Sequence, residues 1–206
     1  LQLRYATQQH QARPLPTDWS LCEQLLARLP FKPTGAQQRV VNDISRDLTQ
    51  PHPMMRLVQG DVGSGKTLVA ALAALQVIAH GGQVVLMAPT ELLAEQHANN
   101  FSNWLTPLGI ETGWLAGKVK GKAREAQLAA IRSGQVKMIV GTHAVFQEQV
   151  EFQHLLLVIV DEQHRFGVHQ RLALREKGAQ DGVYPHQLIM TATPIPRTLA
   201  MTVYAD

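Results

Sequence analysis

The sequence has 206 residues and a formal net charge of +3, and 45% of its residues are hydrophobic. This is ordinary globular composition, and the length fits one large domain with a short extension. No apolar run approaches the roughly 18 residues of a membrane helix. The single cysteine, Cys22, excludes a disulfide within the chain and suits a reducing compartment. The mild excess of basic residues is compatible with a nucleic-acid partner but does not by itself indicate one.

The first 30 residues are expected to form a connector. Residues 1–16 are polar and rich in glutamine and proline, which is typical of a linker or of the end of a preceding domain. A short helix should start at Asp18, an N-cap candidate, with Cys22 as a small buried side chain among its leucines. Because the chain starts at Leu1 without a methionine, we expect a piece of a longer protein.

The main domain is expected to span residues 31–206. It opens with a helix, since Thr34 followed by Gln37 fits a capping box. Short apolar runs then alternate with helical segments. The expected strands are Met55–Val58, Val84–Met87, Lys137–Val140, Leu155–Val160 and Leu188–Met190. The expected helices are Thr67–Ala79, Glu91–Trp104, Ala123–Arg132 and Val168–Lys177. This alternation predicts an α/β fold with a mostly parallel sheet, helices on both faces, and ligands at the carboxyl ends of the strands.

A glycine-rich loop follows the first expected strand. It reads Gly60-Asp61-Val62-Gly63-Ser64-Gly65-Lys66-Thr67, which satisfies G-x-x-x-x-G-K-[ST] between a strand and a helix. Glycines let backbone N–H groups turn toward phosphate oxygens, and the helix start adds partial positive charge. Lys66 should reach the β- and γ-phosphates of ATP, and the Thr67 hydroxyl should hold Mg²⁺. The alternative is a glycine-rich turn before an ordinary helix.

Two adjacent carboxylates follow the buried strand Leu155–Val160. They begin the segment Asp161-Glu162-Gln163-His164. Carboxylates at such a position are costly unless a cation or a proton neutralises them, and a nucleotide loop supplies a reason for a cation. Asp161 would then hold magnesium, and Glu162 would orient and deprotonate the attacking water. The alternative is a strand-ending turn with solvated acids.

Together these motifs resemble the superfamily 2 helicases of the DEAD/DEAH type. The resemblance covers about residues 30–206, and a third motif, Thr191-Ala192-Thr193-Pro194-Ile195-Pro196-Arg197-Thr198, extends it. Within that superfamily, Gln163 favours the bacterial translocases of branched DNA. The resemblance implies a RecA-like P-loop fold, ATP and Mg²⁺ as cofactors, and a cytoplasmic bacterial protein. It also implies forked or four-way DNA as the partner, in repair and recombination.

The resemblance assigns further residues of the nucleotide site. Phe31 and Gln37 match the adenine-recognising segment, where one amide can pair with both N6 and N7 of adenine. Gln163 and His164 would contact the γ-phosphate region. Thr191-Ala192-Thr193 would link hydrolysis to the motion of a partner domain. For Gln37, a helix cap with a surface side chain remains the alternative.

Contacts with DNA are implied at three loops that follow strands or lie between glycines. The residues are Pro89, Thr90, Gly117, Lys118, Lys120, Gly141 and Thr142. Hydroxyls and free N–H groups at helix starts suit phosphates, and lysines on a loop make salt-sensitive phosphate contacts. The alternatives are a plain N-cap for Thr90 and a solvated surface for the lysines.

In such helicases ATP lies between two RecA-like domains. We therefore expect a second RecA-like domain, with its arginine finger, and an N-terminal wedge domain to lie outside these 206 residues. The chain alone should bind nucleotide, hydrolyse it near the basal rate, and be a monomer. Two alternatives stay open: the ATPase part of a restriction- or chromatin-type translocase, and a non-catalytic nucleic-acid-binding module. The intact Lys66, Thr67, Asp161 and Glu162 argue against the second.

Overall fold

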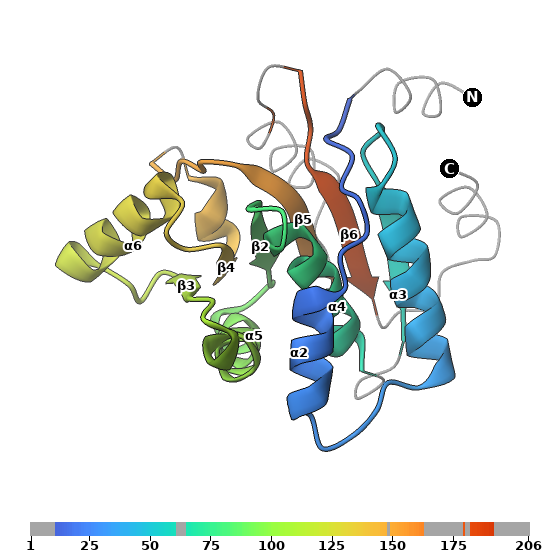
Figure 1. The fold of residues 1–206 in the computed structure, drawn as a ribbon. Coiled ribbons are helices and arrows are strands. Elements are labelled where there is room, and N and C mark those ends of the chain that lie inside the picture. The colour runs from blue at the N-terminus through green and yellow to red at the C-terminus, as the bar shows by residue number, and fades with distance from the viewer. Residues whose placement is uncertain (1–10, 61–64, 148, 163–178, 180–181, 192–206) are drawn as a thin grey trace.

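The computed structural model describes residues 11–60, 65–147, 149–162, 179 and 182–191 (Figure 1). Over these residues, six strands form one sheet in the order β1-β6-β5-β2-β4-β3. The strands are β1 Met55–Gln59, β2 Gln83–Met87, β3 Thr112–Leu115, β4 Met138–Gly141, β5 Leu155–Glu162 and β6 His186–Thr191. All neighbouring pairs run parallel, which confirms the parallel α/β sheet expected from the sequence.

The edge strand β3 is the one described strand that the sequence did not predict. It has four residues, and their burial alternates instead of forming a continuous apolar run. It also contains Gly113, and glycine weakens the signal for a strand. A Cβ at Gly113 would lie 2.8 Å from Val136 Cγ1. Close packing against the segment that leads into β4 therefore favours glycine there.

Helices cover both faces of the sheet. The described helices are α2 Ser20–Arg28, α3 Gly35–Leu48, α4 Lys66–Ile78, α5 Glu91–Leu105 and α6 Gly121–Ser133, with the 3-10 turns η1 Thr106–Leu108 and η2 His143–Phe146. Val84 and Leu86 of β2 pack in one cluster with α2, α3 and α4, whereas Val85 packs in a second cluster with Ile131 of α6. Alternate residues of a strand point to opposite faces, so the expected cover on both faces is confirmed. None of these helices is long and apolar enough to cross a membrane.

Helix α4 lies on the same face of the sheet as α2 and α3 and packs against both helices and the sheet (Figure 1). All its residues from Leu68 to Ile78 are buried, as expected for a helix that is apolar on every side. The thiol of Cys22 on α2 donates to the carbonyl of Leu72 at 3.4 Å. Burial raises the pKa of the Cys22 thiol to about 12, so Cys22 is the small buried side chain that was expected.

Helix α2 begins two residues after its expected start. Trp19 is the N-cap residue and makes no side-chain cap. Asp18 instead accepts hydrogen bonds from the N–H and the hydroxyl of Ser20, at 3.0 and 2.6 Å. These bonds hold the pKa of Asp18 below its usual value.

Residues 11–17 form an extended strap that packs on the domain, although their polar composition predicts a linker. Ala12 and Leu15 are buried, and Leu15 belongs to the same core cluster as α4. The N–H of Ala12 donates to Pro51 O at 2.8 Å, and the N–H of Leu15 donates to Leu48 O at 2.7 Å. Backbone bonding and two apolar side chains therefore hold this segment against the domain, a packing that its polar composition does not reveal.

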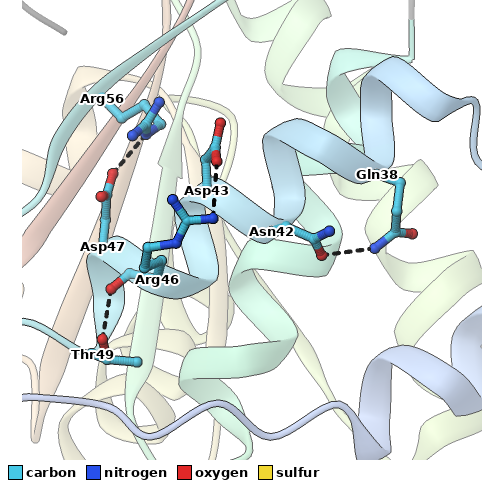
Figure 2. A network of polar contacts seen from close by, with 7 residues as sticks. All are labelled: Gln38, Asn42, Asp43, Arg46, Asp47, Thr49 and Arg56. Carbon is cyan, nitrogen blue, oxygen red and sulfur yellow. Dashed lines mark hydrogen bonds and ion pairs between the residues drawn. The ribbon is translucent and has the colours of Figure 1, made fainter.

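An ion pair fixes α3 beside the edge strand β1 (Figure 2). Arg56 of β1 donates its Nε–H to Asp47 Oδ2 of α3 at 2.6 Å. The two side chains are 23% and 31% exposed, so water screens the pair only in part. The pair holds the carboxyl-terminal half of α3 against the strand that leads into the glycine-rich loop.

Candidate nucleotide site and nucleic-acid pocket

The glycine-rich loop and the acid pair lie at the same edge of the sheet. Gly60 donates its N–H to Thr191 O at 3.1 Å, and both Gln59 and Glu162 lie beside Thr191 in the strand register. Neighbouring strands lie about 4.8 Å apart, so the strands leading into the loop and the acid pair are separated by roughly 10 Å. The single intervening strand is β6, which ends at Thr191.

Helix α4 starts at the described end of the glycine-rich loop. Its N-cap residue is Gly65, with a φ of 84°, a left-handed conformation that favours glycine. Glycine has no side chain that could cap the first N–H groups of the helix, which leaves them suited to an anion. Lys66 and Thr67 form the first turn and are half-buried. The loop residues Asp61, Val62, Gly63 and Ser64 lie outside the described residues.

Gln37 bridges the start of α3 and the glycine-rich loop. The capping box is confirmed: Gln37 N–H donates to Thr34 Oγ1 at 3.2 Å, and Thr34 N–H donates to Gln37 Oε1 at 2.8 Å. The amide Nε2 also donates to Gly65 O at 3.3 Å. A Cβ at Gly65 would lie 1.8 Å from that nitrogen, so any other residue at this position would displace the Gln37 amide.

The adenine role of Gln37 and Phe31 stays a prediction. Both amide atoms of Gln37 already bond to the protein, Oε1 within the capping box and Nε2 to Gly65 O. Phe31 is 50% exposed, an unusual position for a large apolar side chain and one that is open to stacking.

Asp161 is buried at the end of β5, with 5% exposure. Its Oδ2 lies 2.6 Å from Nε2 of His97, a residue of α5. Its Oδ1 has no hydrogen-bond partner in the part of the chain that the structure describes. The side chain of Glu162 and the predicted site residues Gln163, His164, Ala192 and Thr193 lie outside the described residues.

A second feature of the same edge is a pocket of about 370 Å³ where β2, β4 and β3 end. Its lining residues are Pro89, Glu91, Gly117, Val119, Lys120, Arg124, Thr142, His143, Ala144 and Gln147. Four residues predicted to contact DNA are therefore brought together here, namely Pro89, Gly117, Lys120 and Thr142. Lys118, exposed, follows a lining residue in the chain.

The remaining predicted DNA contacts have structural roles that the geometry makes plain. Thr90 caps α5, with its Oγ1 accepting from Leu93 N–H at 3.2 Å, and its side chain is exposed. Gly141 is buried, and a Cβ there would lie 2.2 Å from Leu115 O. Close strand packing explains this glycine without any ligand. Contact of either residue with DNA stays a prediction.

Sequence reasoning missed two groups of residues at this edge. One is His97, which is buried 64 positions away from its partner Asp161. The other is the part of the pocket wall formed by Arg124 and Gln147, where Arg124 Nη2 donates to Gln147 Oε1. Neither belongs to a short motif. The signal available for His97 was a polar residue on the apolar face of α5, and for Arg124 a cation in the first turns of α6.

The parallel strand order and the loop-to-helix junction beside a strand-ending acid pair define a RecA-like P-loop domain. The model of the DEAD/DEAH box helicase family matches residues 34–202. Because that match spans most of the sequence, the chain belongs to the DEAD/DEAH box helicase family.

Relatives in bacteria are much longer than this chain. The ATP-dependent DNA helicase RecG of Escherichia coli K12 is 75% identical over all of this chain, which spans 30% of that protein. RecG of Haemophilus influenzae is 71% identical over 99% of this chain, which spans 29% of it. The resemblance to helicases of this kind, seen first in the three motifs, is confirmed.

Solved structures agree with this assignment. A structure of RecG bound to a three-way DNA junction matches all of this chain with a TM-score of 0.87 and 38% identity, and the match covers 27% of that protein. The UvsW helicase from bacteriophage T4 matches 92% of this chain, and the match covers 67% of that protein, with a TM-score of 0.63. At 16% identity, the second match supports the fold alone.

Proposed function

We propose that this domain binds ATP with magnesium between the glycine-rich loop and the acid pair, and binds the DNA backbone at the neighbouring pocket. The observation that carries the proposal is the strand register, which puts Gly60, Thr191 and Glu162 side by side at one edge. The domain would act as the first motor domain of an ATP-dependent helicase for branched DNA.

The nucleotide chemistry follows from the residue types. The N–H groups at the start of α4 and the Lys66 ammonium bind phosphate oxygens and neutralise their charge. Glu162 orients the attacking water and accepts its proton, while Gln163 and His164 contact the γ-phosphate region. Thr191, Ala192 and Thr193 relay the state of the site to a partner domain. Gln37 and Phe31 recognise adenine.

The residues present fit a magnesium ion. Mg²⁺ prefers hard oxygen ligands, and the Thr67 hydroxyl and the Asp161 carboxylate are of that kind. The Oδ1 atom of Asp161, which lacks a partner within the described residues, supports this assignment. Bound there, the ion would neutralise charge on the β- and γ-phosphates.

The pocket suits a DNA phosphate because its wall carries two cations, Lys120 and Arg124, against one carboxylate, Glu91. Lys120 is exposed at the start of α6, Arg124 lies one turn further on, and the Thr142 hydroxyl lies across the pocket. Such contacts position a backbone without reading its sequence. Pro89, Thr90, Gly117, Lys118 and Gly141 complete the proposed contact set.

The longer protein would complete the motor. A second RecA-like domain would supply an arginine finger, and an N-terminal wedge domain would split a fork or a four-way junction. ATP binding would favour a closed state of the two motor domains on DNA, and hydrolysis would favour the open one. The RecG relatives and the match to RecG on a three-way DNA junction support this proposal. We also propose that the longer protein is a monomer in the bacterial cytoplasm.

Binding of a fluorescent adenine nucleotide, with magnesium, tests the proposal. Lys66→Ala should weaken binding about 10- to 100-fold, the range for losing a charged hydrogen-bond donor to phosphate. The matched control is Lys137→Ala, because Lys137 donates to Gly81 O at the other end of the sheet. Its affinity should stay at the wild-type value. Equal binding by wild type and Lys66→Ala would revive the non-catalytic nucleic-acid-binding module.

A further inference from the structure

Helix α5 places one polar side chain among the residues that it buries. Its buried positions are Ala94, His97, Phe101 and Leu105, at the three- and four-residue spacing of one helix face. A polar group on such a face is destabilising unless it is hydrogen-bonded. His97 is 8% exposed, and its Nε2 lies 2.6 Å from Oδ2 of Asp161. Asp161 therefore satisfies one of the two ring nitrogens of His97, while Nδ1 has no hydrogen-bond partner within the described residues.

The direction of this bond follows from its chemistry. An ionised carboxylate can only accept, so His97 donates its Nε2–H to Oδ2. One oxygen of Asp161 is thus bound to the protein. The other, Oδ1, has no hydrogen-bond partner within the described residues. Partners of this kind orient metal-binding carboxylates, and losing one typically costs about 10- to 100-fold in metal affinity.

We propose that His97 is a positioning residue of the nucleotide site, which holds the Asp161 carboxylate so that Oδ1 is available to the divalent cation. This inference rests on the proposed function. The same helix begins at the pocket, where Glu91 is a lining residue. Six residues of helix, about 9 Å, separate Glu91 from His97, so α5 physically connects the pocket to the acid pair.

The test is the magnesium effect, defined as the ratio of nucleotide dissociation constants without and with Mg²⁺, measured with a fluorescent ADP. His97→Phe keeps a ring but loses the donor, and it should reduce the ratio by about tenfold or more. His97→Leu should do the same. His97→Gln restores a donor and should recover most of the effect. The matched control, Phe101→Leu, alters the same buried face of α5 and should leave the ratio unchanged.

Failure of this inference can be told apart from failure of the proposed function. A wild-type chain without any magnesium effect would overturn the proposed function. A clear wild-type effect that His97→Phe and His97→Gln both leave within about twofold would overturn only the role of His97.

A measurement without metal or nucleotide tests the bond itself. The unfolding equilibrium constants of His97→Phe, Asp161→Ala and the double variant form a cycle. Residues joined by a buried hydrogen bond should deviate from additivity by about tenfold. Additive effects would contradict a bond that holds Asp161 in place.

Discussion

The amino and carboxyl ends of the strands differ in how the polar groups around them are bonded. At the amino end, backbone bonds and buried side chains close the domain: Tyr184 N–H donates to Gln11 O at 2.7 Å, and His186 accepts from Met54 N–H at 2.9 Å. At the carboxyl end, α4 begins from a glycine without a side-chain cap, and exposed lysines border a pocket. The polar groups named at the amino end are hydrogen-bonded, whereas the first N–H groups of α4 at the carboxyl end have no side-chain cap.

This difference predicts that the stability of the domain and its affinity for ligands depend on opposite ends of the sheet. Buried and hydrogen-bonded groups determine the free energy of unfolding, and available donors determine the affinity for phosphate. Substitutions at the amino end should therefore lower stability at constant affinity. Substitutions of the exposed cations at the carboxyl end should weaken phosphate binding at nearly constant stability.

The largest effect concerns ATP turnover. The described carboxyl edge is one wall of the proposed site, so the 206-residue chain alone should hydrolyse ATP at a low rate with or without branched DNA. A polypeptide as long as the relatives should be roughly 10³–10⁵ times faster with DNA, the contribution of an arginine finger from another domain. A phosphate-release assay measures both rates. Brisk DNA-stimulated turnover by the 206-residue chain would show that its edge is already a complete site.

The second prediction concerns the strap at the amino end. Leu15 is 2% exposed, and Leu15→Ala should lower the free energy of unfolding by about 2–5 kcal/mol, the usual cost of truncating a buried leucine. Nucleotide affinity should not change. The control is Leu92→Ala, since Leu92 is 66% exposed and its loss should cost less than about 0.5 kcal/mol. Urea unfolding measures both, and a strap variant of wild-type stability would contradict a structural role for residues 11–17.

The third prediction concerns the cations at the pocket. Lys120→Ala should weaken binding of a labelled forked DNA several-fold at low salt and reduce the slope of log affinity against log salt by about 0.9. Arg132→Ala removes the same charge near the other end of α6, about 18 Å further along the helix. That control should keep the wild-type slope. Equal slopes for the two variants would argue that α6 contributes only general positive charge.

The smallest effect is a dependence of stability on pH at the amino end. Burial lowers the pKa of His186, although the Arg13 carbonyl and Asp47 oppose the shift. The unfolded chain therefore binds a proton more readily than the folded one. Above the unfolded-state pKa of about 6.5, neutral His186 makes its full contribution to the free energy of unfolding. That contribution is lost as the pH falls from there toward the folded-state pKa.

Urea unfolding between pH 5 and pH 8 measures this dependence. His186→Gln cannot titrate and should flatten the slope on the acidic side, without abolishing it, because the pKa of His154 is also lowered by burial. An unchanged slope would mean that His186 is not the group responsible.

Much of the fold could be predicted because the core strands are continuous apolar runs. Leu155–Val160 is such a run, and the capping box at Thr34 marks the start of α3 where the structure has it. The misses have physical causes. Strand β3 is short and contains a glycine, and the strap is ordered by backbone bonds that composition does not encode.

The candidate site divides in the same way. The glycine-rich loop and the acid pair are each a short continuous segment of the sequence, so the chemistry of each could be predicted without a structure. His97 could not be assigned, since its role depends on a contact across 64 positions of the chain. Arg124 and Gln147 likewise meet only when α6 and the turn after β4 fold together.

The most direct test of the central claim is a crystal structure of the chain with Mg²⁺ and a non-hydrolysable ATP analogue. The proposed site predicts phosphates at the start of α4 and a magnesium ion about 2.1 Å from the Thr67 hydroxyl. Asp161 Oδ1 should bind this ion directly or through one water. A nucleotide bound elsewhere, or an ion held without Thr67 and Asp161, would contradict it.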